Sequence, residues 1–368
     1  MQTDYIIVGN GLAGSLLAWH LLLQEKNVVI IDEFNNTVAS QVSAGIFLPI
    51  TGRRIVRTWM ADELLAEVKT IFTQLGKLIG ETYLYEMPVV EIPASVKEWN
   101  EWQQRASSPD ISKYISRFLA PNSIESVHCP FGAIELKNSG YVNISKCVTF
   151  LRKLYLDMEI IIEGKFNFDD LQYSDKIVYK DIVADKIIFC EGAAGINNPF
   201  FNYLPFQLSK GEILTIRCNT LSEEQIFNHG IFILPIGNQL FRVGSTYEWN
   251  DLTTNTTESA RNNLSEKLQT VLKSDFEIVD QKAGIRPSVK ERRPFIGIHP
   301  KHKNIGIFNG LGTKGVMLAP YFAKHFAWHL AHQKTVNGRC GYSSFFLNYF
   351  SFLRLSISCV IILNSRPI

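Results

Sequence analysis

The sequence carries almost no net charge: 37 Lys and Arg stand against 35 Asp and Glu in 368 residues, a formal charge of +2. So balanced a chain has no general attraction for nucleic acid or for acidic membrane surfaces, and we expect neither as a partner. The six cysteines lie far apart and include no Cys-x-x-Cys pair. That absence argues against a zinc site or a redox dithiol, and we expect no metal.

The N-terminus lacks a secretory signal, because the apolar residues 5–8 follow no basic segment and run directly into glycines. We therefore expect a cytoplasmic protein with reduced thiols. Hydrophobic residues make up 46% of the chain and charged residues 20%, which is typical of a globular protein with a large core. A length of 368 residues predicts two domains.

The first 33 residues contain a dinucleotide-binding pattern. Residues 4–8 predict a buried strand, residues 9–14 fit GxGxxG, and a helix followed by a second strand is expected over residues 15–31. Gly9 permits the tight turn, Gly11 admits a pyrophosphate to the backbone, and Gly14 lets helix and strand pack closely. Asp32 lies 18 residues after Gly14 (32 − 14), where a carboxylate accepts hydrogen bonds from ribose hydroxyls. This segment predicts binding of the ADP half of NAD or FAD.

Two later segments end a strand in a glycine-rich turn. Residues 186–190 predict a buried strand before the turn at 191–195. Residues 305–308 predict another strand, which the turn Asn309-Gly310-Leu311-Gly312-Thr313-Lys314-Gly315 joins to a helix at about 316–330. The N-terminus of that helix favours an electron-rich part of a ligand.

With these turns, the chain resembles the D-amino-acid oxidase, glycine oxidase and sarcosine oxidase family of flavoproteins over about residues 3–332. The resemblance rests on the order and spacing of GNGLAG with Asp32, Ser43-Ala44-Gly45, Gly140-Tyr141-Val142-Asn143, IIFCEGAAG, AGIRP with RRPFIG, and NGLGTKGVMLAP. It implies an α/β fold with a Rossmann-like FAD-binding domain (GR2 type) assembled from residues 1–83, 136–204 and 283–335. An inserted α+β substrate domain, built on an antiparallel sheet, would comprise residues 84–135 and 205–282.

The resemblance also implies which residues hold FAD. The ADP half would contact the first glycine motif and the acidic end of the second strand, and the flavin would lie near the other turns. The implied cofactor-binding residues are Gly9, Gly11, Leu12, Ala13, Gly14, Asp32, Glu33, Ala44, Gly45, Gly192, Gly310, Gly312, Thr313, Lys314 and Gly315. Among them, Lys314 could stabilise negative charge at the N1/O2 side of reduced flavin.

Arg286 in AGIRP matches the family position that binds the substrate carboxylate, a task that suits the planar guanidinium. Relatives often place a tyrosine in a strand before a Pro-Arg dipeptide. Here residues 231–236 read Ile-Phe-Ile-Leu-Pro-Ile, so both the phenol and the arginine are missing. Tyr247 is the candidate substitute.

The function expected from these features is oxidation of the C–N bond of an amino acid or N-alkyl amino acid, by hydride transfer to flavin N5. One alternative is an FAD oxidoreductase that modifies the tRNA wobble uridine, because NGLGTKGVMLAP also resembles such enzymes. Another is a non-catalytic flavin-binding protein, which the missing tyrosine and Pro-Arg would suit. The amine, the electron acceptor and the oligomeric state stay open.

Residues 336–368 form an atypical apolar tail. Its segment 343–363 has 21 residues (363 − 343 + 1), enough to span a bilayer, but Arg354 lies at its centre. A charge there costs about 2.5 to 3.5 kcal/mol. A docked tail or a foreign end produced by a shifted reading frame fits the abrupt change better than a membrane anchor.

We expect FAD to be bound non-covalently. Some relatives attach flavin through a cysteine near the last glycine turn, and residues 309–320 contain no cysteine. Acid precipitation of the purified protein should therefore release the yellow colour into the supernatant, where flavin absorbance measures it. A yellow pellet would contradict this prediction.

Overall fold

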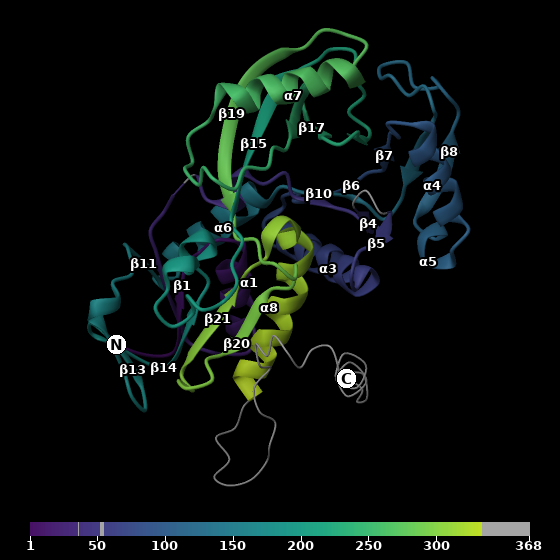
Figure 1. The fold of residues 1–368 in the computed structure, drawn as a ribbon. Helices are drawn as coiled ribbons and strands as arrows, with labels where there is room; N and C mark the ends of the chain where they lie inside the picture. The colour runs from purple at the N-terminus through teal and green to yellow at the C-terminus, as the bar shows by residue number, and fades with distance from the viewer. Residues whose placement is uncertain (36, 52–54, 333–368) are drawn as a thin grey trace.

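The computed structural model describes residues 1–35, 37–51 and 55–332. Within them, two eight-stranded sheets form the framework (Figure 1). The first contains β1 (Gln2–Val8), β2 (Val28–Asp32), β11 (Ile161–Glu163), β12 (Leu171–Tyr173), β13 (Ile177–Tyr179), β14 (Ile182–Phe189), β20 (Phe295–Ile298) and β21 (Ile305–Asn309). The second contains β7 (Val89–Glu91), β8 (Ile115–Leu119), β9 (Ala133–Leu136), β15 (Ser209–Arg217), β16 (Ile226–Asn228), β17 (Phe232–Gly237), β18 (Leu240–Gly244) and β19 (Glu277–Arg286).

The first sheet has a parallel centre. Strands β11, β2, β1 and β14 lie side by side in that order, and β21 joins β14 in parallel. Strands β12, β13 and β20 pair antiparallel at its margins. The carboxyl ends of β1, β14 and β21 therefore meet at one edge, and a glycine turn follows each of them, as in nucleotide-binding α/β folds.

Eight helices accompany the sheets in the described residues. They are α1 (Leu12–Leu22), α2 (Ala39–Val42), α3 (Ala61–Ile79), α4 (Val96–Ala106), α5 (Pro109–Ser112), α6 (Ile144–Asp157), α7 (Glu258–Val271) and α8 (Gly315–His332). Helices α1 and α8 pack against each other on one face of the first sheet. Aromatic side chains such as Phe166, Phe189 and Phe201 cover the other face. Burial on both faces explains the continuous apolar runs in β1 and β2.

The second sheet is antiparallel except where β16 pairs with β7. On its outer face, Leu214 and Phe241 pack beneath Leu264 and Leu268 of α7. Side chains alternate along a strand, so the intervening residues of β15 and β18 lie on the inner face, toward the first sheet. This inner face contacts α2 at Gly284 of β19, where a Cβ would lie 3.2 Å from Val42.

Two small sheets complete the strands. One joins β3 (Ile46–Phe47), β10 (Gly140–Val142) and β6 (Leu84–Glu86), and the other pairs β4 (Ile50–Thr51) with β5 (Val56–Arg57). No helix of the described residues is long and apolar enough to cross a membrane. The tail predicted at 336–368 lies outside the described residues.

The fold class expected from the sequence is confirmed: a Rossmann-like α/β unit is combined with an antiparallel sheet. Asn143, expected just before a helix, is the N-cap of α6, and its Oδ1 accepts a hydrogen bond from Lys146 N. Strand β19 continues past the boundary placed between residues 282 and 283, and its last residue is Arg286. That extension holds Arg286 in the second sheet.

Glu91 of β7 supplies a prediction on stability. Burial raises the pKa of Glu91 to about 7, while Asn228 Nδ2 donates to both carboxylate oxygens at 2.9 Å. The folded protein therefore binds a proton more tightly than the unfolded chain, and stability should fall as pH rises from about 4.5 to 7. Between these two pH values, the free energy of unfolding of the wild type should fall by at most about 3 kcal/mol relative to that of Glu91→Gln.

Urea unfolding at pH 5 and pH 8 measures this effect. The exposed Glu224 provides a matched control, because Glu224→Gln should leave the pH dependence of the wild type unchanged. Parallel pH profiles for the wild type and Glu91→Gln would contradict the prediction.

Candidate functional site

The turn between β1 and α1 depends on glycine at two positions. Gly9 has a φ of +99°, which glycine adopts without strain. A Cβ at Gly14 would lie 1.9 Å from Gly9 O, so no side chain fits between turn and helix. No side chain caps α1 at Gly11, and its first turn, which includes Leu12 and Ala13, holds no acidic residue. These features fit a bound pyrophosphate, which the free N–H groups of a helix N-terminus attract.

Asp32 ends β2 beside this turn. Its Oδ1 accepts a hydrogen bond from Asn10 N at 2.7 Å, and its Oδ2 lies 2.6 Å from Arg152 Nη1 of α6. The Arg152 guanidinium also lies over the ring of Phe34. Each carboxylate oxygen keeps a second lone pair for a ribose hydroxyl. Glu33, the next residue, is exposed.

Sequence reasoning missed two residues at this end of the site. Ser40 Oγ accepts a hydrogen bond from Leu12 N at 3.0 Å. A side chain of α2 therefore occupies one of the N–H groups at the start of α1. Arg152 comes from α6, 120 residues from its partner Asp32. No local pattern marks either residue, because each contact depends on how distant elements pack.

The other expected turns gather at the same edge of the first sheet. Gly45 has a φ of +70°, and a Cβ there would lie 2.0 Å from Val142 O, which fixes the turn that contains Ala44 against β10. Asn309 Nδ2 donates to Gly192 O at 2.9 Å and so joins the ends of β21 and β14. Gly310 also has a positive φ, and the 3-10 turn Gly312–Lys314, with Thr313 at its centre, leads into α8 at Gly315.

Lys314 is a half-buried cation without a carboxylate partner among the described residues. Its Nζ lies 3.0 Å from Thr51 Oγ1 and 3.3 Å from Thr58 Oγ1. Burial, together with the nearby charges of Arg292 and Arg293, lowers the pKa of Lys314 to about 8. The Arg293 guanidinium lies over the Trp59 ring, 3.9 Å from its centroid. Positive charge is therefore concentrated at the start of α8.

The Arg286 side chain lies against Gly211 of β15, on the inner face of the second sheet. A Cβ at Gly211 would lie 1.8 Å from Arg286 Nη2, so the guanidinium occupies the space above this glycine. Nη2 donates to Ser245 Oγ at 2.8 Å and to Thr246 O at 3.1 Å, and Nη1 donates to Lys210 O at 3.2 Å. All three acceptors are neutral. Burial lowers the pKa of Arg286, as expected for a cation without a counter-ion.

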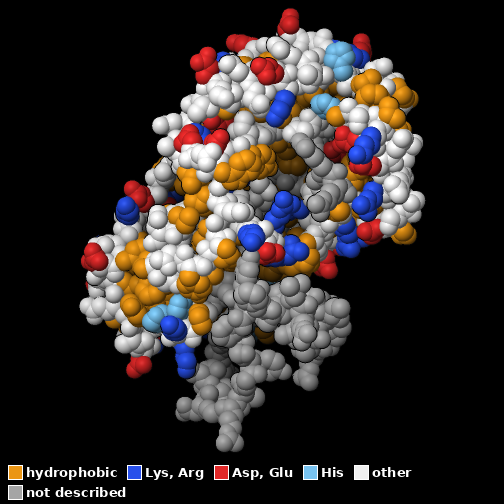
Figure 2. Space-filling view, viewed as in Figure 1, with side chains coloured by type: hydrophobic (Ala, Val, Ile, Leu, Met, Phe, Trp, Pro, Cys, Tyr) orange, Lys and Arg blue, Asp and Glu red, His pale blue; other side chains and the backbone are white. Residues whose placement is uncertain are grey.

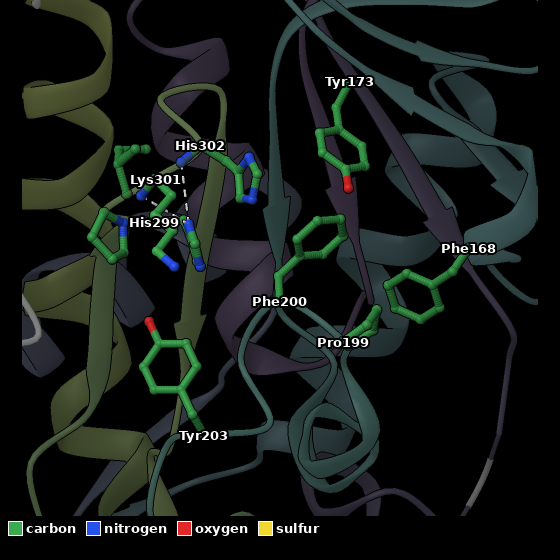
Figure 3. A pocket seen from close by; sticks show the side chains of 10 residues that line it. Phe168, Tyr173, Pro199, Phe200, Tyr203, His299, Lys301 and His302 are labelled. Atoms are coloured by element: carbon green, nitrogen blue, oxygen red, sulfur yellow. Dashed lines mark hydrogen bonds between the residues drawn. The ribbon is translucent and has the colours of Figure 1, made fainter.

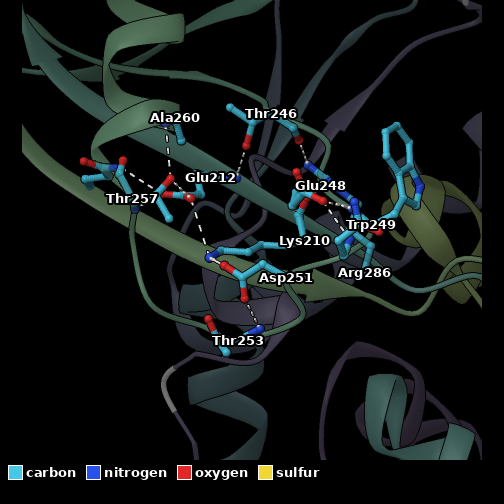
Figure 4. A network of polar contacts seen from close by, with 12 residues as sticks. Lys210, Glu212, Thr246, Glu248, Trp249, Asp251, Thr253, Thr257, Ala260 and Arg286 are labelled. Atoms are coloured by element: carbon cyan, nitrogen blue, oxygen red, sulfur yellow. Dashed lines mark hydrogen bonds and ion pairs between the residues drawn. The ribbon is translucent and has the colours of Figure 1, made fainter.

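Tyr247, the candidate substitute for the missing tyrosine, lies beside Arg286. The Tyr247 ring lies over the guanidinium, with 4.4 Å between the Arg286 Cζ and the ring centroid, and about half of Tyr247 is exposed. An ion pair between the buried Lys210 and the partly exposed Asp251 holds the loop of Tyr247, since Lys210 Nζ lies 2.5 Å from Asp251 Oδ2 (Figure 4). Lys210 and Glu248 also exchange two backbone hydrogen bonds.

A third functional candidate, Arg242 of β18, was not expected from the sequence. Its Nη1 donates to Ser43 O at 3.3 Å, in the Ser43-Ala44-Gly45 turn. An arginine in a strand is usually read as a surface residue, and only the sheet register shows that this one points inward. Lys and Arg side chains gather below the hollow between the two sheets in Figure 2.

A separate cavity of about 750 Å³ contains none of the expected site residues (Figure 3). Aromatic rings and two histidines line it, and His299 Nδ1 accepts backbone hydrogen bonds from Lys301 N and His302 N. Burial lowers the pKa of His299. No group of His, Cys, Asp and Glu in the described part of the chain is arranged to hold a metal ion.

The chain is similar in sequence and in fold to known flavoproteins. A family model described as "FAD dependent oxidoreductase" matches residues 4–328. The glycine oxidase of Pseudomonas putida is 23% identical over 343 residues, covering 87% of this chain and 92% of that protein. The crystal structure of glycine oxidase from Geobacillus kaustophilus has a TM-score of 0.77 at 17% identity, covering 92% of this chain and 96% of that one.

The iminodiacetate oxidase of Chelativorans sp. BNC1 has a TM-score of 0.76 at 18% identity, covering 91% of this chain and 97% of that one. At these identities the solved structures establish the fold. The family model covers most of the chain, including every glycine turn described above.

The glycine contact in the first turn generates a prediction. Gly14→Ala places a methyl group 1.9 Å from Gly9 O, so the turn must open and the affinity for FAD should fall at least about tenfold. Titration of the apoprotein with FAD, followed by flavin fluorescence, measures it. At Gly80 a Cβ meets nothing within 4 Å, so Gly80→Ala is the control: it should lower stability through its φ of +71° but keep FAD binding. Wild-type affinity in Gly14→Ala would overturn the assignment.

Proposed function

The chain belongs to this family of FAD-dependent oxidoreductases, and from that membership we propose that it oxidises the C–N bond of an amino acid or N-alkyl amino acid. The observation that carries the proposal is Arg286, a half-buried guanidinium whose hydrogen-bond acceptors in the described residues are all neutral. The glycine oxidases and the iminodiacetate oxidase among the similar proteins act on substrates of this class by name.

Arg286 binds the substrate carboxylate. Three of the five N–H donors of its guanidinium are used by Lys210 O, Ser245 Oγ and Thr246 O, which fix its plane. The two remaining donors, one on Nε and one on Nη1, lie on different edges of the guanidinium, so a carboxylate can accept from either one, and that ion pair supplies the negative charge that the site lacks. Tyr247, above the guanidinium, limits where the rest of the substrate can lie.

FAD, when bound, supplies the acceptor for a hydride at flavin N5. With the carboxylate fixed, the substrate Cα and nitrogen keep one orientation, and this orientation accounts for much of the rate. Oxidation would remove a hydride from the substrate Cα and a proton from its nitrogen to give a C=N bond, with bound FAD as the two-electron acceptor. The imine then reacts with water. Molecular oxygen or another electron carrier completes the cycle.

Lys314 would hold positive charge close to the flavin, at the start of α8. Thr51 and Thr58 fix its ammonium group, and the dipole of α8 adds to its effect. Its role is to stabilise negative charge at the N1/O2 side. The remaining cofactor contacts, the domain boundaries and the cytoplasmic location expected from the sequence stay predictions.

Two substitutions test the carboxylate anchor. Arg286→Ala removes the guanidinium, and Gly211→Ala displaces it because the new Cβ would lie 1.8 Å from Nη2. Both should raise the half-saturating substrate concentration about 10- to 100-fold, the range expected when hydrogen bonds to a charged group are lost. Anaerobic bleaching of the flavin by a panel of amino acids and N-methyl amino acids measures it.

Arg217→Ala is the matched control, because Arg217 is exposed on the same sheet and pairs with Glu277. It should behave as the wild type. Reduction of Arg286→Ala at the wild-type rate would remove the proposed anchor, and a flavin that no amine reduces would favour a non-catalytic flavin protein.

A further inference from the structure

The inner face of the second sheet carries a second guanidinium beside Arg286. Phe241 and Val243 of β18 pack on the outer face beneath α7, so Arg242 and Gly244 between and after them point inward. In the sheet register, Arg242 lies opposite Thr215 of β15 and Leu234 of β17. Leu234 packs in the core shared with the first sheet. Arg242 therefore faces the same space as Arg286.

The guanidinium groups of Arg286 and Arg242 lie at the two ends of one stretch of this face. Arg286 Nη2 bonds to Ser245, three residues beyond Arg242 in the chain. The Arg286 guanidinium lies against Gly211 of β15, four residues from Thr215, the partner of Arg242, and four residues of strand span about 13 Å. Arg242 Nη1 reaches Ser43 O, next to the Ala44-Gly45 turn. Arg242 thus lies at the far end of the substrate space from Ser245 and beside the turn expected to contact flavin.

Arg242 also lacks a counter-ion among the described residues. Its hydrogen bond there is the long one to the neutral Ser43 O, which accounts for one of five N–H donors. Burial lowers the pKa of Arg242, and the nearby Tyr141 and Asp280 oppose that shift without an ion pair. A structural arginine would gain more from a nearby carboxylate, because an unpaired buried charge is costly.

We propose that the substrate carries two carboxylates, and that Arg242 binds the second while Arg286 binds the one next to the reacting carbon. This inference rests on the proposed function. The second carboxylate can belong to the substituent on nitrogen or to the side chain on Cα. In both cases a substrate with one carboxylate leaves Arg242 unpaired, so the site should discriminate against it.

Unreactive ligand pairs test the proposal on the FAD-loaded protein. Methoxyacetate and diglycolate differ by one terminal carboxylate and carry an ether oxygen in place of the oxidisable nitrogen. Propionate and succinate make the same comparison along a carbon chain, which represents a side-chain carboxylate. Titration of the oxidised flavin spectrum gives each dissociation constant without turnover.

The wild type should bind the dicarboxylate of at least one pair about 10- to 100-fold more tightly than its partner. Arg242→Gln should abolish most of that preference and change monocarboxylate affinity by less than about twofold, whereas Arg242→Lys should retain part of it. Arg217→Gln, exposed on the same sheet, should keep the full preference.

The outcomes separate this inference from the function on which it rests. Equal affinity for both members of both pairs in the wild type, or an undiminished preference in Arg242→Gln, overturns the role of Arg242 alone. If Arg286→Ala leaves monocarboxylate binding unchanged, the carboxylate anchor itself is wrong. The wild-type comparison is decisive even where a variant fails to fold.

Discussion

The candidate site depends on one arrangement: the Arg286 guanidinium lies against Gly211, and no carboxylate of the described residues pairs with it. Arg286 can lie flat on β15 because Gly211 has no Cβ, and β19 must extend to Arg286 for the side chain to reach Ser245. Neutral acceptors fix the orientation but leave the charge unbalanced. An unpaired, partly buried cation is unfavourable. An anionic ligand would offset this cost by forming an ion pair with the guanidinium.

The sequence was informative where the chemistry is local. The turn at Gly9, Gly11 and Gly14 requires glycine for reasons that involve neighbouring residues and one adjacent strand, so its spacing alone predicted the strand, turn and helix that the structure contains. Arg286 was recognisable because its motif, AGIRP, is short and continuous. The antiparallel sheet could be expected from β15, β17 and β18, whose alternating residues pack on opposite faces.

Residues that act across the sheets were not predictable in this way. Arg242 acquires its position from pairing with Thr215 and Leu234, and a shift of one residue would turn it toward α7. Arg152 meets Asp32 only because α6 packs against α1 and against β11, the strand next to β2. The lowered pKa of Lys314 arises from burial and from charges more than twenty residues away. These properties belong to tertiary contacts, which no local pattern encodes.

The near-neutral composition conceals a strongly uneven distribution of charge. With 37 basic and 35 acidic residues the chain as a whole attracts neither sign, yet Arg242, Arg286 and Lys314 all lie inward without ion pairs in the described residues. Acidic side chains such as Asp62 and Glu135 instead pair with exposed bases at the surface. This segregation supports the proposed selectivity, because cations held at fixed positions would repel simple amines and favour amines that carry carboxylates.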